Sequence, residues 1–194
     1  MKKALFVLLA LLLLSPAAMA KKVGDVEVAD KITLNGQDLV LNGAGVRVKK
    51  VAFININIYT GGLYLTAKNL DGPSIINADA PMAIRLYLTT NHASKDKLIT
   101  AWNEGFERAT GGNIAPIKEE ITKYNALFKT DPKEGDIYEI AYVPGKGISV
   151  ALNGASQGDA IPGLEFKKAV LGIWLAKNID DKYLSDLKEG LLGK

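Results

Sequence analysis

The order of two hydrophobic periodicities along the 194-residue chain constrains its fold more than any other feature of the sequence. Residues 82–90 alternate, with Ile84, Leu86 and Leu88 on one side, which is typical of a half-buried strand. Further strand-like runs occupy residues 26–34, 39–41, 63–67, 136–143 and 148–152, and helical spacing recurs in residues 94–108, 116–128, 166–174 and 183–191. Along the chain, strands come first, helices follow, and strands and helices then occur again. This order is typical of an α+β domain with a mainly antiparallel sheet.

The first twenty residues have the three parts of a secretory signal. Lys2 and Lys3 form a basic end, residues 4–14 are an unbroken apolar run, and Ala18-Met19-Ala20 is a small-x-small cleavage site. The apolar run is shorter than the roughly 20 residues that a membrane-spanning helix needs, although a retained N-terminal anchor is the alternative. We therefore predict a signal peptide at residues 1–20 and one domain at residues 21–194, periplasmic or secreted, with no stable membrane span after cleavage.

Composition excludes several classes of function. The chain contains no cysteine, which rules out disulfides, thiolate metal sites and a cysteine nucleophile. The net charge of +3 includes Lys2 and Lys3, so no strong basic field remains after cleavage and no nucleic-acid partner is expected. Gly43-Ala44-Gly45 lacks the third glycine of a dinucleotide-binding loop, and the Walker, zinc-protease and serine-elbow motifs are absent.

The remaining titratable clusters carry no recognisable chemistry. His92 is the only histidine, so a Ser-His-Asp triad would have to use it. Its position before the helix expected at residues 94–108 indicates a solvated or loop-capping residue, and a ligand contact or an axial haem ligand is the alternative. The acidic residues around Asp180 and Asp181 are typical of a solvated helix face, and a cation site is the alternative. We predict no catalytic residue, no metal ion and no cofactor.

The most informative polar residues lie in residues 41–65. If this segment is extended without a bulge, Arg47, Asn57 and Tyr59 share one face, while Ile54, Ile56 and Ile58 share the other and belong to the core. A guanidinium group suits a carboxylate because its fork donates two parallel hydrogen bonds, and a phenol can donate a third. The polar face is therefore either solvent-exposed or the floor of a pocket.

A shared site at Arg47 and Tyr59 requires the chain to reverse between them. A straight strand of this length would separate the two residues by roughly 40 Å at 3.3 Å per residue, too far for one carboxylate. The segment must therefore fold back near residues 51–53. No Asn-Gly or Asp-Gly pair marks a turn at that place.

Five segments, in order, resemble the bacterial chalcone isomerase-like proteins over about residues 26–193. They are "NGAGVR", "IYTGGLYL", "AWNEGF", "GDIYEIAYVPGKGISVALNG" and "AVLGIWLAKNIDDKYLSDLKEGLLG". The resemblance implies an open-faced β-sandwich, in which helices pack on one face of a large antiparallel sheet. The family includes plant enzymes that close a chalcone to a flavanone, non-catalytic fatty-acid-binding proteins, and many secreted bacterial members.

The resemblance also implies roles for individual residues. Arg47 matches the arginine that stabilises the substrate oxyanion in the enzymes and contacts the carboxylate in the fatty-acid binders. Tyr59 falls at the enzymes' catalytic threonine, close to a carboxylate-contacting tyrosine of the fatty-acid binders. The enzymes' tyrosine and asparagine pair has no match in residues 94–108. The candidate ligand-binding residues are Arg47, Tyr59, Asn57 and Tyr64.

The function that this reasoning favours is secreted, non-catalytic binding of a small amphipathic acid such as a fatty acid. Three alternatives stay open at this point. The chain could be an intramolecular lyase or isomerase of the chalcone type that uses Arg47 as electrophile. It could bind haem through His92 or a tyrosine, or it could be an envelope interaction module without a ligand.

Overall fold

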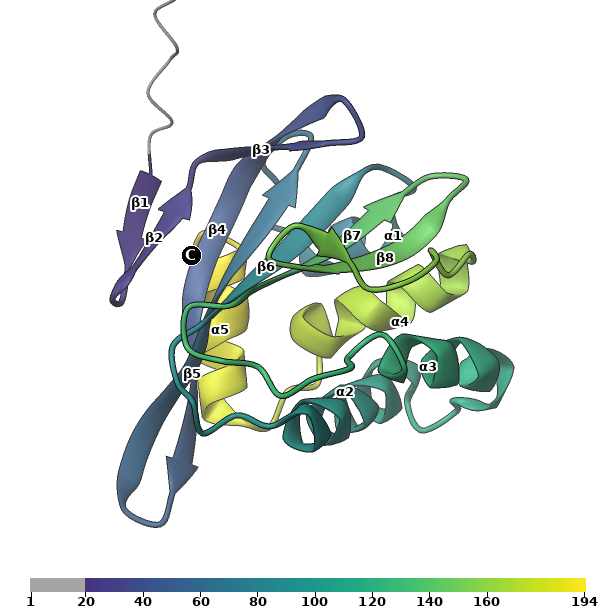
Figure 1. Cartoon of the computed structure of the whole chain (residues 1–194). Coiled ribbons are helices and arrows are strands. Elements are labelled where there is room, and N and C mark those ends of the chain that lie inside the picture. Colours follow the sequence, from purple (N-terminus) through teal and green to yellow (C-terminus); the bar gives the residue numbers. More distant parts are fainter. Residues whose placement is uncertain (1–19) are drawn as a thin grey trace, which may run out of the picture.

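The computed structural model describes residues 20–194, and its largest element is one antiparallel sheet. Seven strands follow one another across this sheet in sequence order, so each strand pairs with the next along the chain (Figure 1). They are β3 (Lys31–Leu34), β4 (Gln37–Val51), β5 (Ile54–Leu65), β6 (Met82–Leu88), β7 (Ile137–Val143), β8 (Gly147–Leu152) and β9 (Ala155–Ser156). A separate ribbon pairs β1 (Ala20–Val23) with β2 (Val26–Ala29). The predicted signal peptide lies outside the described residues except for Ala20.

Within residues 20–194, five α-helices pack against the sheet and against one another, and they confirm the predicted α+β fold. They are α1 (Gly72–Asn77), α2 (Lys95–Thr110), α3 (Lys118–Asn125), α4 (Leu164–Leu175) and α5 (Lys182–Leu191). Figure 1 shows α2, α3 and α4 together under the curled sheet, with α5 lying along β4. Ser94 caps α2 by accepting a hydrogen bond from the backbone N–H of Lys97, and Gly111 ends this helix at a φ of 63°. Among residues 20–194, no helix is long and apolar enough to cross a membrane.

The space between sheet and helices is filled by aromatic side chains. Trp102 on α2 lies 5.3 Å from Trp174 on α4 between ring centroids, and 5.9 Å from Phe128. Tyr124 on α3 adds an edge-to-face contact with Phe106. Rings in such tilted arrangements interact favourably beyond the area they bury. This aromatic core lies directly behind the cavity described below.

The opposite face of the sheet has a smaller apolar cluster. It contains Leu39, Leu41, Tyr64, Ala83, Tyr87 and Ala141 of the sheet, with Val28 of β2 and Ile32 of β3. The tyrosines of this cluster satisfy their hydroxyls internally, since the hydroxyl oxygens of Tyr64 and Tyr87 lie 3.1 Å apart. The two clusters show that both faces of the central strands are buried.

Glycines allow α5 to lie against β4. A Cβ atom at Gly190 would lie 2.7 Å from the backbone oxygen of Ala44, and one at Gly43 would collide with the backbone oxygen of Gly190. Close backbone approach of this kind excludes every residue with a side chain. The Gly43-Ala44-Gly45 sequence therefore serves helix packing, and it places the start of α5 next to Arg47.

Candidate functional site

The β4–β5 hairpin supplies the reversal that a shared site requires. Val51 pairs with Ile54, so the chain turns through Ala52 and Phe53, and Arg47 then pairs directly with Tyr59. Ala52 takes a φ of 52°, in the left-handed region that residues other than glycine and asparagine rarely adopt. An Ala-Phe turn contains none of the residues that favour turns, which explains why it cannot be predicted from the local sequence.

A β-bulge beside Arg47 changes which side chains share a face. Arg47 pairs with Tyr59 but the next residue, Val48, pairs with Asn57, so Ile58 is an extra residue on β5. One extra residue reverses the alternation of the strand on one side of the bulge. Ile56 and Ile58 consequently line the same cavity as Arg47 and Tyr59. The prediction that the isoleucines form a separate core face is wrong, and Ile54 is 68% exposed.

The cavity has a volume of about 410 Å³ and lies between the hairpin and α2. This volume is within the range of about 300–1,000 Å³ for small-molecule sites. Its apolar walls come from Val51, Ile56 and Ile58 on the hairpin and from Leu98, Ala101 and Trp102 on α2. A larger hollow of about 610 Å³ opens among α1, α2 and α4, but it is more open to solvent and contains none of the four predicted site residues.

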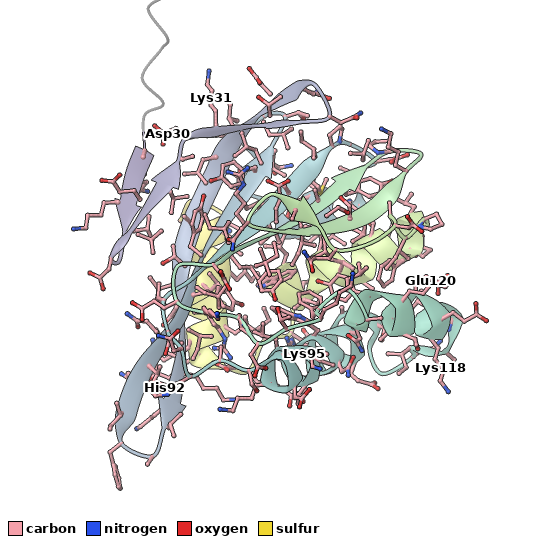
Figure 2. The ribbon with its side chains drawn as sticks, in the orientation of Figure 1. Asp30, Lys31, His92, Lys95, Lys118 and Glu120 are labelled. Atoms are coloured by element: carbon pink, nitrogen blue, oxygen red, sulfur yellow. The ribbon has the colours of Figure 1, made fainter. Side chains whose placement is uncertain are left out.

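The polar lining of the cavity is mainly basic. Arg47, Lys49 and Lys97 contribute three cations, against one carboxylate from Glu104. His92 also lines the cavity, in the loop before α2, and Figure 2 shows it beside the lower part of the β4–β5 hairpin. The backbone N–H of His92 donates a hydrogen bond to Thr90 Oγ1, and its backbone oxygen accepts one from Lys97 Nζ. The charge balance of the lining favours an anionic ligand.

Arg47 already holds a carboxylate of its own chain. Its Nη2 lies 2.8 Å from Asp181 Oδ2 and its Nη1 3.3 Å from Oδ1, while Nη1 also donates to the backbone oxygen of Val48 at 2.9 Å. The arginine side chain is 17% exposed and the aspartate 44%. Burial alone would raise the pKa of Asp181, but hydrogen bonds from Arg47 and from the backbone N–H of Leu184 hold that pKa below its usual value.

Tyr59 is buried at the inner end of the cavity. Its hydroxyl oxygen accepts a hydrogen bond of 3.0 Å from Trp174 Nε1 and makes no further hydrogen bond within residues 20–194. Burial raises the pKa of Tyr59 to about 12, although the Trp174 hydrogen bond and the Arg47 charge act against this shift. The phenol is therefore neutral at pH 7 and has a proton to donate into the cavity. Trp102 Nε1 is a second buried donor without a partner in the described part of the chain.

The other two predicted residues do not reach the cavity. Asn57 is exposed, because the bulge at Ile58 turns it away from the face that Tyr59 occupies. Tyr64 lies an odd number of positions from Tyr59 on regular strand and so faces the opposite side of the sheet. There its hydroxyl donates to the backbone oxygen of Ala29 at 2.9 Å. The structure thus brings Arg47 and Tyr59 together and separates them from Asn57 and Tyr64.

Sequence reasoning missed Asp181, Trp174 and Lys97. Asp181 had a visible signal as a helix cap, since its Oδ1 accepts from the N–H of Leu184 three residues later. Its contact with Arg47 joins residues 134 positions apart, which no local pattern could indicate.

Comparisons with known proteins agree on the fold. The model of a family described as chalcone isomerase-like matches residues 20–193. Among solved structures, a fatty-acid-binding protein of Arabidopsis thaliana is similar with a TM-score of 0.65 and 18% sequence identity, covering 84% of this chain and 95% of that protein. At this identity the likeness shows a shared fold. No curated protein sequence matches the chain.

Proposed function

The chain belongs to the chalcone isomerase-like family, and we propose that it binds a small amphipathic acid such as a fatty acid without catalysing a reaction. The observation that carries this proposal is the pairing of Arg47 with Tyr59 in a cavity with apolar walls. The solved structure that resembles this fold is that of a fatty-acid-binding protein, which supports the same ligand class.

The donors at the polar end suit a carboxylate. Three hydrogen bonds to Asp181 and Val48 use three of the five N–H groups of Arg47, so two remain for a ligand. The neutral phenol of Tyr59 provides a third donor. Trp174 donates a hydrogen bond to the phenol oxygen, so the O–H proton of Tyr59 remains for the ligand. The alkyl chain of the ligand would lie against Ile56, Ile58 and Leu98.

The same groups are poorly suited to isomerisation. A phenol whose pKa is about 12 cannot accept a proton at neutral pH. By the family resemblance, Tyr59 also falls where the enzymes have their catalytic threonine. Asp181 offsets part of the charge of Arg47, which weakens that side chain as an electrophile. These two features favour binding over catalysis.

We place the protein outside the cytoplasm, in the periplasm or secreted. This part of the proposal rests on the signal-like residues 1–20. N-terminal sequencing of the protein recovered from culture fractions tests it: a mature N-terminus at Lys21 in a periplasmic or extracellular fraction is expected, and Met1 in a cytoplasmic fraction would contradict it.

The binding function is tested on one purified sample. Native mass spectrometry is expected to show a co-purified lipid acid, and calorimetry should show binding of dodecanoic acid with at least tenfold weaker binding of dodecanol, which lacks the carboxylate. Equal affinity for acid and alcohol would overturn the assignment of Arg47 and Tyr59. A Soret band in the absorption spectrum would favour the haem alternative instead.

A further inference from the structure

The turn of the β4–β5 hairpin exposes an apolar tip, which we define as Val51, Ala52, Phe53 and Ile54. Phe53 is 96% exposed, Ile54 68% and Val51 53%. Figure 1 shows this end of the hairpin projecting past both the sheet and the helices. In the described chain, Leu70 is the only other large apolar residue that is exposed. These side chains contact little of the fold, so they do not serve its packing. An exposed apolar patch of this kind indicates a surface that becomes buried against another molecule or a membrane.

Two consecutive lysines precede the apolar tip. Lys49 and Lys50 immediately precede Val51 and both are exposed. No aspartate or glutamate occurs between residues 39 and 70, so the hairpin beyond Asp38 carries only positive charge. The acidic group that faces it from α5 is Asp181, which is paired with Arg47. Apolar side chains next to ammonium groups are complementary to an anionic lipid surface, where the former enter the interface and the latter contact headgroups.

Residues beside the tip are bonded to α5, and the tip is continuous with the cavity. Tyr183 on α5 donates a hydrogen bond of 3.0 Å to Asn55 Oδ1, and Arg47 is anchored to Asp181 on the same helix. Val51 belongs to the tip and also lines the cavity, as do the neighbouring residues Lys49 and Ile56. Contact between the tip and a flat surface would therefore bring the mouth of the cavity to that surface.

We propose that the β4–β5 hairpin docks the protein reversibly on anionic lipid bilayers, with Phe53 inserted and Lys49 and Lys50 against the headgroups. The docking itself does not depend on the ligand of the cavity. Its consequence, passage of an amphipathic acid between bilayer and cavity, rests on the proposed function.

Co-sedimentation with vesicles tests the docking. Purified protein should bind vesicles of equimolar phosphatidylcholine and phosphatidylglycerol and bind pure phosphatidylcholine far more weakly, with binding reduced by added salt. Phe53→Ser should lower the vesicle partition coefficient about tenfold or more, the effect of withdrawing one buried aromatic side chain. Lys50→Gln should lower it about fivefold.

Two matched controls separate the hairpin from general surface effects. Leu70→Ser removes an exposed apolar residue elsewhere, and Lys118→Gln removes a cation from the far end of the helical layer (Figure 2). Neither should change vesicle binding measurably. If Leu70→Ser or Lys118→Gln weakens binding as much as the hairpin variants, the hairpin is not the docking element and the proposal fails.

A fluorescent reporter gives an independent measurement. Both natural tryptophans are buried, with exposures of 2% for Trp102 and 0% for Trp174, so Phe53→Trp adds one exposed indole. Its emission should shift to the blue on anionic vesicles and be quenched by brominated lipid. An unchanged spectrum overturns insertion. Concentration-dependent dimerisation that Phe53→Ser abolishes, without vesicle binding, would show that the tip contacts a second protein chain and also overturns the proposal.

Discussion

Arg47 and Asp181 join β4 to the start of α5 through a bidentate ion pair, with nitrogen–oxygen distances of 2.8 and 3.3 Å. The same aspartate caps α5 by accepting a hydrogen bond of 3.1 Å from the N–H of Leu184. The Asp181 carboxylate therefore caps the first turn of α5 and also binds the guanidinium group of Arg47, which is proposed to hold the ligand. A ligand carboxylate has to share Arg47 with Asp181 or displace it.

Asp181→Asn is expected to tighten binding of dodecanoic acid about five- to tenfold, because it removes the competing charge and keeps a side chain that caps helices well. Titration calorimetry measures the change. Asp186→Asn is the control, since Asp186 lies on the same helix but is paired with Lys182 at 2.6 Å in an exposed position. Weaker binding in Asp181→Asn would mean that Asp181 positions Arg47 and does not compete for it.

Arg47→Ala is expected to weaken binding of dodecanoic acid by about 1.5–3 kcal/mol, the range for hydrogen bonds to charged groups. The free energy of unfolding should change little, because the pair with the 44%-exposed Asp181 is partly solvated. Lys50→Ala serves as control, since it removes the same charge from the same strand outside the cavity. An equal loss of affinity in both variants would contradict a specific role for Arg47.

Features that depend on neighbouring residues could be predicted from the sequence, and features that depend on residues far apart in the chain could not. The strand in residues 82–90 and the cap at Ser94 are local patterns, and both appear in the structure as β6 and α2. The turn at Ala52 and the bulge at Ile58 leave no local signal, because they are imposed by pairing across the hairpin. They decide the site, since the turn brings Tyr59 to Arg47 and the bulge removes Asn57. The family resemblance identified Arg47 and Tyr59 from the sequence. The pairing of Arg47 with Asp181 could not be predicted in this way, because it depends on how α5 packs against the sheet.

Tyr124→Phe is expected to raise the free energy of unfolding by about 1 kcal/mol. The hydroxyl of Tyr124 is buried and has no hydrogen-bond partner within residues 20–194, so its desolvation is uncompensated. Urea denaturation at pH 7 measures the change. Tyr64→Phe is the contrasting variant and should lower stability by a similar amount, because it loses hydrogen bonds to Ala29 and Tyr87. A loss of stability in Tyr124→Phe would indicate a bound partner for this hydroxyl, such as an ordered water.

Stability should fall as the pH rises from 10 to 12. Burial raises the pKa of Tyr59 from 10.0 to about 12, so in this window the unfolded chain releases a proton that the folded chain retains. The folded state then binds more protons than the unfolded state, and the free energy of unfolding decreases with pH, by about 2–3 kcal/mol for a shift of this size. Tyr59→Phe should make the profile less steep between pH 10 and 12, and the remaining fall belongs to Tyr64, Tyr124 and Tyr142, whose pKa values burial also raises. An unchanged slope in this variant would assign the alkaline loss to other buried tyrosines.

The final prediction is that the purified protein does not convert chalcone to flavanone above the uncatalysed rate. Ring closure needs an electrophilic donor together with a group that manages the proton, and positioned groups of this kind typically contribute about 10²–10⁴-fold. Arg47 supplies the donor but shares its charge with Asp181, while the Tyr59 phenol holds its proton up to a pH of about 12. The Tyr59 ring also lines the cavity and is larger than a threonine side chain, which suits a thin alkyl chain better than a substrate with two rings. Loss of chalcone absorbance measures the rate, and Arg47→Ala is the control. Stereoselective turnover that disappears in this variant would replace the binding function with an isomerase.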